Sequence, residues 1–232
     1  MNEKCVSKKN VNCETCEGRA SNSVFCTLDA DALQIIDQTK SVNIYKKGQY
    51  IFYTGNPASG LYCINSGVVK LESEGKAGTS HLHRVVSKGG VLGYRSLFAD
   101  EEYASSAIAH EDAIVCYIPK AAVFELIKKH PNVGLNFLSH ISKELRAAEM
   151  RHKNLADKEA PRRVAETVLQ LKKNFPEVTW SRKEISEWAD TTPETVMRSL
   201  SDFKSKGYID LVGKKIEIKN LNAFVNFADP PL

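Results

Sequence analysis

The sequence predicts an α+β protein with a strand-rich first half, a long central helix and a helical C-terminal part that ends in a hairpin. Short apolar runs between residues 42 and 119 are separated by Gly48, Gly55, Gly60 and Gly67. Many short strands with regular turn signals are typical of a sandwich or barrel. Helical periodicity returns after this region, and 232 residues are enough for two ordinary domains.

The pattern divides the chain into four segments. We expect a cysteine-rich N-terminal segment (1–28), a strand-rich domain (29–130), a long helix (131–156) and a C-terminal helical domain (157–232). The strand-rich domain should open with a short helix from about Asp29 to Ser41, because apolar residues recur there at helical spacing.

The long helix carries an apolar seam. Its members follow one another at alternating steps of three and four residues, which is the pattern of a coiled coil: Leu138, Ile141, Leu145, Ala148 and His152. One interpretation is a helix face packed on its own domain. We favour a dimer interface, because the helix links two differently patterned halves of the chain.

Composition narrows the class of protein. No stretch approaches the roughly 20 apolar residues of a membrane span, and the N-terminus has no apolar core of a secretory signal. A cytoplasmic protein is therefore expected. Residues 151–220 hold 15 Lys/Arg and 11 Asp/Glu, a surplus that equals the net charge of +4 for the whole chain. A basic balance confined to one third of the chain indicates an acidic partner, such as a phosphate backbone.

Two capped helices with a tight turn are predicted near the C-terminus. Ser181 lies three residues before Glu184, the spacing of a capping box. Asp190 follows at a turn that needs a left-handed backbone, which Asp tolerates better than most residues. Thr192 is a natural N-cap, and Pro193 suits the first position of the second helix. The apolar faces should bury Ile185, Trp188, Ala189, Val196, Leu200 and Phe203.

The second helix presents polar side chains that are suited to reading bases in a major groove. With the N-cap Thr192, the residues expected to contact DNA there are Glu194, Thr195, Met197, Arg198 and Ser201. A plain pair of antiparallel helices is the alternative. Residues 207–218 read as a β-hairpin, however, with Lys214 and Lys215 at its tip within reach of phosphates. Two such helices followed by a hairpin predict a winged helix-turn-helix bound to double-stranded DNA.

Four of the six cysteines lie within the first 26 residues, which is unusual for core cysteines. Disulfides are rare in cytoplasmic proteins, so metal binding, redox chemistry or burial must explain these cysteines. A thioredoxin-like pair at Cys13 and Cys16 would require a βαβ unit, which the pattern lacks. The chain also offers no convincing nucleophile and base, so we do not expect an enzyme.

From Cys13 to Ile218 the chain resembles the CRP/FNR family of bacterial transcription factors. Residues 47–71 look like a cyclic-nucleotide-binding-type β-roll, and the spacing of Glu194 to Arg198 matches the family's recognition helix. The resemblance implies a homodimer on a palindromic site, with RNA polymerase as a partner. Pro193 stands where CRP-like members carry Arg. In this respect the chain is closer to FNR-like proteins, and the resemblance implies TTGA-type half-sites.

The resemblance also bears on cyclic AMP. In CRP-like sensors a Glu binds the ribose and an Arg pairs with the cyclic phosphate. Tyr94 stands at the place of that Glu, and Tyr103 or Ala104 at the place of that Arg. A buried phosphate without its paired cation costs several kcal/mol, so cyclic AMP is not expected to bind. Arg95 remains available for another anion or for a surface ion pair.

The resemblance to FNR-like oxygen sensors implies a [4Fe–4S] cluster held by Cys13, Cys16, Cys26 and Cys116. Here the gap between the second and third cysteines is longer than in those proteins. A pair of cysteines separated by two residues, as Cys13 and Cys16 are, suits one edge of such a cluster.

Two alternatives stay open for the N-terminal cysteines. Cys13, Cys16 and Cys26 could form a zinc site or a thiol sensor, or they could be unligated. Cys63 lies on a predicted strand and is interpreted as a small buried hydrophobe, and Cys5 as a spare ligand.

Overall fold

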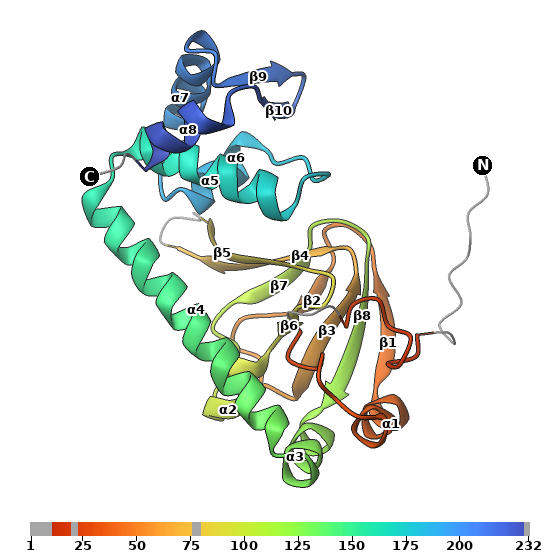
Figure 1. Ribbon diagram of the computed structural model, residues 1–232. Helices are drawn as coiled ribbons and strands as arrows, with labels where there is room; N and C mark the ends of the chain where they lie inside the picture. Colours follow the sequence, from red (N-terminus) through yellow and green to blue (C-terminus); the bar gives the residue numbers. More distant parts are fainter. Residues whose placement is uncertain (1–10, 20–22, 76–79, 230–232) are drawn as a thin grey trace, which may run out of the picture. The chain divides into compact units, whose positions relative to one another are not determined.

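A computed structural model describes residues 11–19, 23–75 and 80–229 (Figure 1). Cys5, interpreted above as a spare ligand, lies outside the described residues. The described residues divide into two compact units: those within 1–74 and 83–144, and those within 75–82 and 145–232.

Two four-stranded antiparallel sheets form the strand-rich part. One sheet has the order β1 (Ser41–Tyr45), β8 (Ala113–Pro119), β3 (Gly60–Ser66), β6 (Val91–Leu92). The other has the order β2 (Tyr50–Phe52), β7 (Ser106–Ala109), β4 (Val68–Glu74), β5 (Ser80–Ser87). Buried side chains from both sheets form one core, among them Phe52, Ile64, Val69, Leu71 and Val115. The sandwich predicted from the turn spacing is therefore confirmed.

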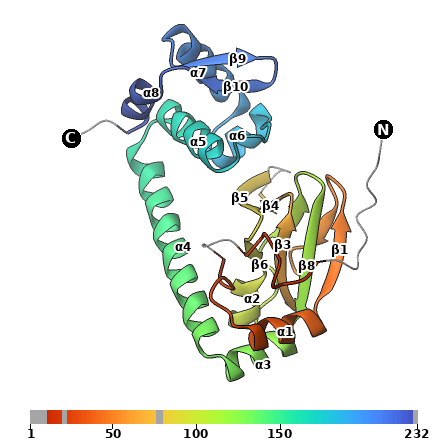
Figure 2. The ribbon, with the colours of Figure 1, turned by 45° about the vertical axis from the view of Figure 1, so that its right-hand side comes forward.

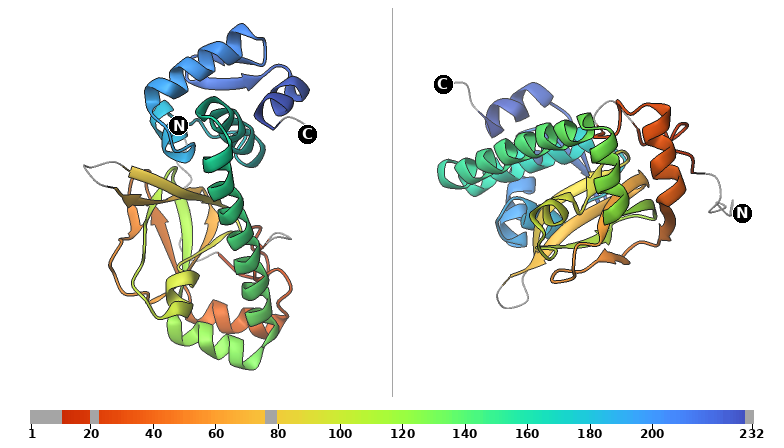
Figure 3. Two further views of the ribbon diagram at one scale, coloured as in Figure 1. Left: turned by 90° about the vertical axis from the view of Figure 1, so that its left-hand side faces the viewer. Right: turned by 90° about the horizontal axis from the view of Figure 1, so that it is seen from below.

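Helices cover the other face of the first sheet. They are α1 (Ala30–Thr39), α2 (Tyr94–Ala99), α3 (Lys120–Lys129) and the start of α4 (Asn132–Asp157). Because side chains alternate along a strand, Leu61 of β3 and Ile118 of β8 point into this helical layer while Ile64 and Val115 point between the sheets. Helices α1 and α3 lie side by side in every view (Figures 2 and 3). Helix α1 was predicted; α2 was not.

Helix α4 is the long helix predicted from the seam. Two residues separate its end from α5 (Ala160–Asn174). Val133 and Phe137 in its first turns are buried. Along the seam, Leu138 and Leu145 are 61% and 60% exposed, whereas Ile141 is half-buried and packs on the first unit's core. Within the described chain, Ile141 therefore packs on its own domain, as the alternative interpretation expected. Leu138 and Leu145 do not.

The second unit contains α5, α6 (Arg182–Trp188), α7 (Pro193–Ser205), the hairpin of β9 (Ile209–Val212) and β10 (Lys215–Ile218), and α8 (Leu221–Ala228). The two helices, their turn and the hairpin occur where the sequence predicted them, and α8 was not foreseen. Its core includes Phe203 and Phe224, whose ring centroids are 5.1 Å apart. None of the helices in the described ranges is long and apolar enough to cross a membrane.

Candidate DNA-binding surface and cysteine cavity

The turn between α6 and α7 forms as the capping residues predict. The Ser181 hydroxyl accepts from the Glu184 amide at 3.2 Å, and the Glu184 carboxylate accepts from the Ser181 amide at 2.9 Å. Asp190 has φ +48° in the turn. The Thr192 hydroxyl accepts from the Thr195 amide at 3.2 Å, and Pro193 opens the second helix. These are local interactions, which explains why the sequence alone predicts them.

Two arginines that the sequence analysis missed hold this turn from outside. Arg163 of α5 donates to the carbonyl oxygens of Ala189 and Asp190 at 3.0 and 3.1 Å. Arg151, near the end of α4, donates to the Trp188 carbonyl at 3.1 Å. The final carbonyls of a helix have no partner within it, so cationic donors there stabilise both the helix end and the turn.

Two side chains on the helix pair differ from expectation. Trp188 is half-buried rather than part of the buried stripe, and the Arg151 guanidinium stacks over its ring at 5.3 Å. Thr195 was expected to face solvent but is half-buried, and its hydroxyl lies 3.1 Å from the Thr192 hydroxyl. The Thr195 hydroxyl therefore takes part in the helix cap.

The remaining predicted contact residues of α7 are exposed: Glu194, Met197, Arg198 and Ser201. Gly213 has φ +58° at the tip of the hairpin, next to exposed Lys214 and Lys215.

The basic side chains of this unit differ in their pairing. Lys204 and Lys206 are ion-paired with Asp210 and Asp202. Within the described ranges, Arg198, Lys214 and Lys215 have no carboxylate partner. Their charges are thus available to an acidic partner.

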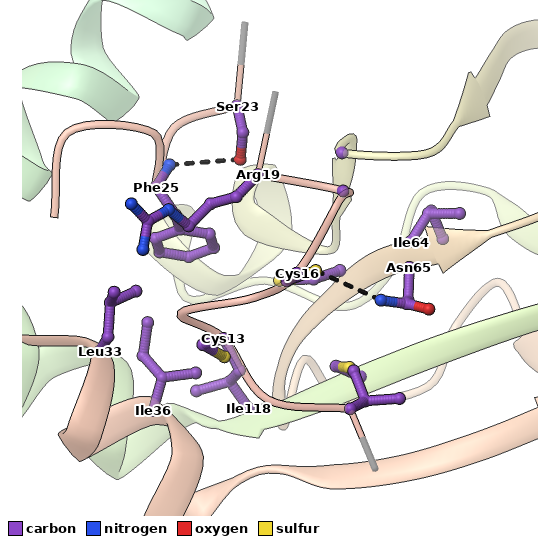
Figure 4. A pocket seen from close by; sticks show the side chains of 15 residues that line it. Cys13, Cys16, Arg19, Ser23, Phe25, Leu33, Ile36, Ile64, Asn65 and Ile118 are labelled. Carbon is purple, nitrogen blue, oxygen red and sulfur yellow. Dashed lines mark hydrogen bonds between the residues drawn. The ribbon is translucent and has the colours of Figure 1, made fainter. Parts of the chain in front are cut away.

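A small cavity of about 50 Å³ lies between the N-terminal segment and the helical face of the first sheet. Three of the four predicted metal ligands, Cys13, Cys16 and Cys116, line it, together with Cys63. Figure 4 shows Cys13 and Cys16 at the cavity with the Asn65 amide directed at Cys16. Cys26 is not among the lining residues. Cys63, interpreted as a buried hydrophobe, is instead half-buried at the cavity wall.

Polar donors reach two of these sulfur atoms in otherwise apolar surroundings. The Lys40 ammonium lies 3.1 Å from Cys13 Sγ and is ion-paired with Asp37, and its side chain is only 5% exposed. Asn65 Nδ2 lies 3.2 Å from Cys16 Sγ. Hydrogen bonds to sulfur and low solvent exposure are the features by which proteins tune iron–sulfur clusters. The lining thiols and donors therefore fit such a group chemically.

Burial favours the protonated thiol at Cys13, Cys63 and Cys116. It raises the pKa of Cys13 to about 11, against the lowering effect of Lys40. It also raises the pKa values of Cys63 and Cys116. Thiolates are the metal ligands, so metal binding here would release protons. No three Cys, His, Asp or Glu side chains of the described residues are placed to hold a metal ion.

Tyr94, which the family resemblance places at the ribose-binding Glu of cyclic-AMP sensors, is buried. Its hydroxyl donates to Glu144 of α4 and accepts from Arg84 at 2.5 Å. Arg84 is also ion-paired with Glu144 at 2.6 Å. The Arg84 guanidinium at this position is thus already engaged by a carboxylate of α4.

The helix pair, its hairpin and its unpaired cations define a DNA-binding protein of the winged helix-turn-helix class. Residues 42–130 match the family described as the cyclic nucleotide-binding domain, and residues 162–227 the Crp-like helix-turn-helix domain. The chain belongs to the CRP/FNR family of transcriptional regulators and is not an enzyme.

Individual relatives agree with this assignment. The chain is 27% identical to the fumarate and nitrate reduction regulatory protein of Escherichia coli, over 84% of this chain and 80% of that protein. It is 26% identical to the anaerobic regulatory protein of Haemophilus influenzae, over 93% and 87%. A CRP/FNR-family transcriptional regulator from Thermus thermophilus aligns with a TM-score of 0.70 and 25% identity, over 82% and 98%. FixK2 from Bradyrhizobium japonicum aligns with a TM-score of 0.75 and 22% identity, over 84% and 100%, which supports the fold.

Proposed function

We propose that this regulator binds palindromic DNA as a homodimer and responds to oxygen or redox state through a cysteine-bound iron–sulfur cluster. One observation carries the sensory part: Cys13 and Cys16 of the N-terminal segment and Cys116 of β8 line the same cavity. The N-terminal pair and Cys116 are about a hundred positions apart in the chain. Relatives named for fumarate and nitrate reduction and for anaerobic regulation support a signal of this kind.

Cys13, Cys16 and Cys116 would supply thiolate ligands, and Lys40 and Asn65 would donate to ligand sulfurs. The bound cluster would supply a redox-active, oxygen-labile group, of the [4Fe–4S] type in our proposal. The apolar wall, including Phe25, Leu33 and Ile118, would restrict solvent access.

The cavity is connected to the long helix by direct contacts. Phe25 lines the cavity and packs edge-on against Phe137 of α4, with ring centroids 5.8 Å apart. Asn136 of α4 donates to the Val24 carbonyl at 3.1 Å and to the Thr27 hydroxyl at 2.9 Å. A rearrangement of the N-terminal segment would therefore act on α4 within the same unit, which gives the coupling a physical path.

The proposed dimer interface is the seam of α4. Its members are largely uncovered in the single chain, with the exception of Ile141: Leu138, Leu145, Ala148 and His152. Such a row of exposed apolar side chains at coiled-coil spacing is suited to a second copy of the same helix. The dimer would present two recognition helices to the two halves of a palindrome.

The double substitution Leu138→Glu and Leu145→Glu is expected to convert the dimer into monomers, because it places like charges in the apolar seam. Sedimentation equilibrium would measure the mass, and fluorescence anisotropy the loss of affinity for a palindromic site. Leu221→Glu is the matched control, since Leu221 is 56% exposed but lies in α8. A double variant that remains dimeric would rule out the seam as the interface.

On the DNA side, exposed Glu194, Met197, Arg198 and Ser201 are proposed to face the bases, with the half-buried Thr195 beside the cap. Thr192, Lys214 and Lys215 are proposed to contact the backbone. A TTGA-type half-site is the expected sequence, RNA polymerase the expected protein partner and the cytoplasm the expected location.

Anaerobically purified protein is expected to be coloured and to contain iron and acid-labile sulfide, because the cavity brings thiols together. Exposure to air should remove the colour and weaken binding to a TTGA-type palindrome. Metal analysis and a visible spectrum, followed by a gel shift before and after air, measure both effects. A colourless, iron-free protein that binds its operator equally well in air would refute the sensory proposal.

A regulator without a cluster is the second candidate, and one observation favours it. A cavity of about 260 Å³ lies beside Tyr94, with Arg84 and Arg95 among its lining residues. Glu101 also lines this cavity and Arg84 is paired with Glu144, so Arg95 is the side chain that would pair there with a small anionic ligand other than cyclic AMP. Zinc or thiol oxidation at the N-terminal cysteines is the other cluster-free signal.

A further inference from the structure

Cys63 and Cys116 stand directly opposite each other on neighbouring antiparallel strands, β3 and β8. Directly opposed residues in such a pair point to the same face of the sheet, with Cβ atoms about 4.5–5.5 Å apart. That face is the helical one, because Leu61 and Ile118, each two residues away along its strand, lie in the core beneath the helices. The two thiols therefore form a neighbouring pair that faces the N-terminal segment.

The N-terminal segment provides a second pair of thiols above this one. Cys13 and Cys16 line the same cavity as Cys63 and Cys116. Gly18 allows the close approach: a Cβ atom at that position would be 3.1 Å from the Ile64 carbonyl and 3.3 Å from Cys16 Sγ. Four thiols from three separate parts of the chain thus meet at one small cavity. Of these four, Cys63 has no role in the function proposed above.

Cys26 occupies a different position. Its neighbour Phe25 lines the cavity, whereas Cys26 does not. The backbone there is held in a turn, with the Cys26 amide donating to the Ser23 carbonyl at 3.1 Å. Phe25 is also packed against Phe137, and the Val24 carbonyl accepts a hydrogen bond from the Asn136 side chain. The two residues before Cys26 are thus held against α4 in an arrangement that leaves Cys26 outside the cavity lining.

We propose that Cys63, and not Cys26, completes a four-thiolate site with Cys13, Cys16 and Cys116. This assignment rests on the proposed iron–sulfur function and specifies its ligands. Each thiol that ligates the metal gives up its proton.

Tetrahedral zinc with bonds of about 2.3 Å brings its sulfur ligands to within about 3.8 Å of one another. No group of three ligands among the described residues is arranged to hold one ion. A four-iron cluster binds each thiolate through a different iron atom, so its ligands stand farther apart.

The test compares Cys63→Ala with Cys26→Ala in the full chain, reconstituted anaerobically with iron and sulfide. We expect Cys26→Ala to bind iron and sulfide like the unaltered protein. Cys63→Ala should lower the affinity for the cluster at least about 10-fold, since even outer-shell substitutions cost that much at metal sites. A second readout is alkylation of the loaded, unaltered protein followed by mass spectrometry, in which Cys26 should react and Cys63 should be protected. Circular dichroism of each metal-free variant checks that it folds.

The outcomes separate the two proposals. If the unaltered protein binds iron, and Cys63→Ala binds it equally while Cys26→Ala does not, the ligand assignment is overturned and the iron–sulfur function stands. If the unaltered protein takes up no iron and sulfide at all, both are overturned. Loss of iron in Cys63→Ala alone, with Cys63 protected from alkylation, supports the assignment.

Discussion

Replacing Arg198 with alanine is expected to reduce the preference for a TTGA-type operator over a scrambled site by about 10- to 100-fold, or about 1–3 kcal/mol. Arg198 lies on the exposed face of α7, in its second turn, and no carboxylate of the described residues neutralises it. An unpaired guanidinium there can make two hydrogen bonds to one guanine, and alanine leaves both acceptors without a partner. Fluorescence anisotropy with both DNA duplexes at one salt concentration measures the effect.

Lys214→Ala is the matched control for this experiment. Lys214 is exposed next to the hairpin tip at Gly213, and we expect it to contact phosphates rather than base edges. Its removal should weaken binding to both duplexes equally. It should also reduce the slope of log affinity against log salt concentration by about one, the value of a single phosphate contact. If Arg198→Ala behaves in the same way, Arg198 contacts the backbone and another residue of α7 reads the bases.

Replacing Phe203 with alanine should lower the free energy of unfolding of the C-terminal unit by about 3–5 kcal/mol. The ring is 0% exposed and stacks edge-on against Phe224 and Phe227, with centroids 5.1 and 5.3 Å away. The small side chain would leave a cavity between α7 and α8, which these helices cannot close without losing their other contacts. Urea unfolding measures the change, and DNA binding should fall with it.

Met197→Ala on the same helix is the control for the stability measurement. Met197 is 54% exposed, so its loss should change the free energy of unfolding by less than about 0.5 kcal/mol. A Phe203→Ala variant with nearly unaltered stability would mean that α8 does not contribute to the core, because Phe224 and Phe227 both belong to α8.

The features of the helix pair that could be predicted are those that depend on neighbours in the sequence. Ser181 with Glu184, the turn at Asp190 and the cap at Thr192 involve residues within a few positions of one another. The half-buried state of Trp188 was not predictable in this way. It depends on Arg151, which stacks on the ring from a different helix, 37 positions earlier.

The N-terminal cysteines show the same limit more sharply. The resemblance to FNR-like sensors implied Cys26 as the ligand that follows the pair at Cys13 and Cys16. Cys63 looked like a small core residue, because a strand pattern alone does not say which strand lies beside it. A shift of one residue between β3 and β8 would turn Cys63 to the opposite face of the sheet.

Taken by itself, the sequence determined the class of fold, the capped helix pair opening at Pro193 and the basic hairpin tip at Lys214. These follow from local capping, turn chemistry and periodicity. Only the tertiary structure decided which thiols share the cavity and which arginines hold the helix-turn-helix. Those choices depend on the register of β3 against β8 and on the packing of α4 and α5 on the turn, where residues far apart in the chain become neighbours.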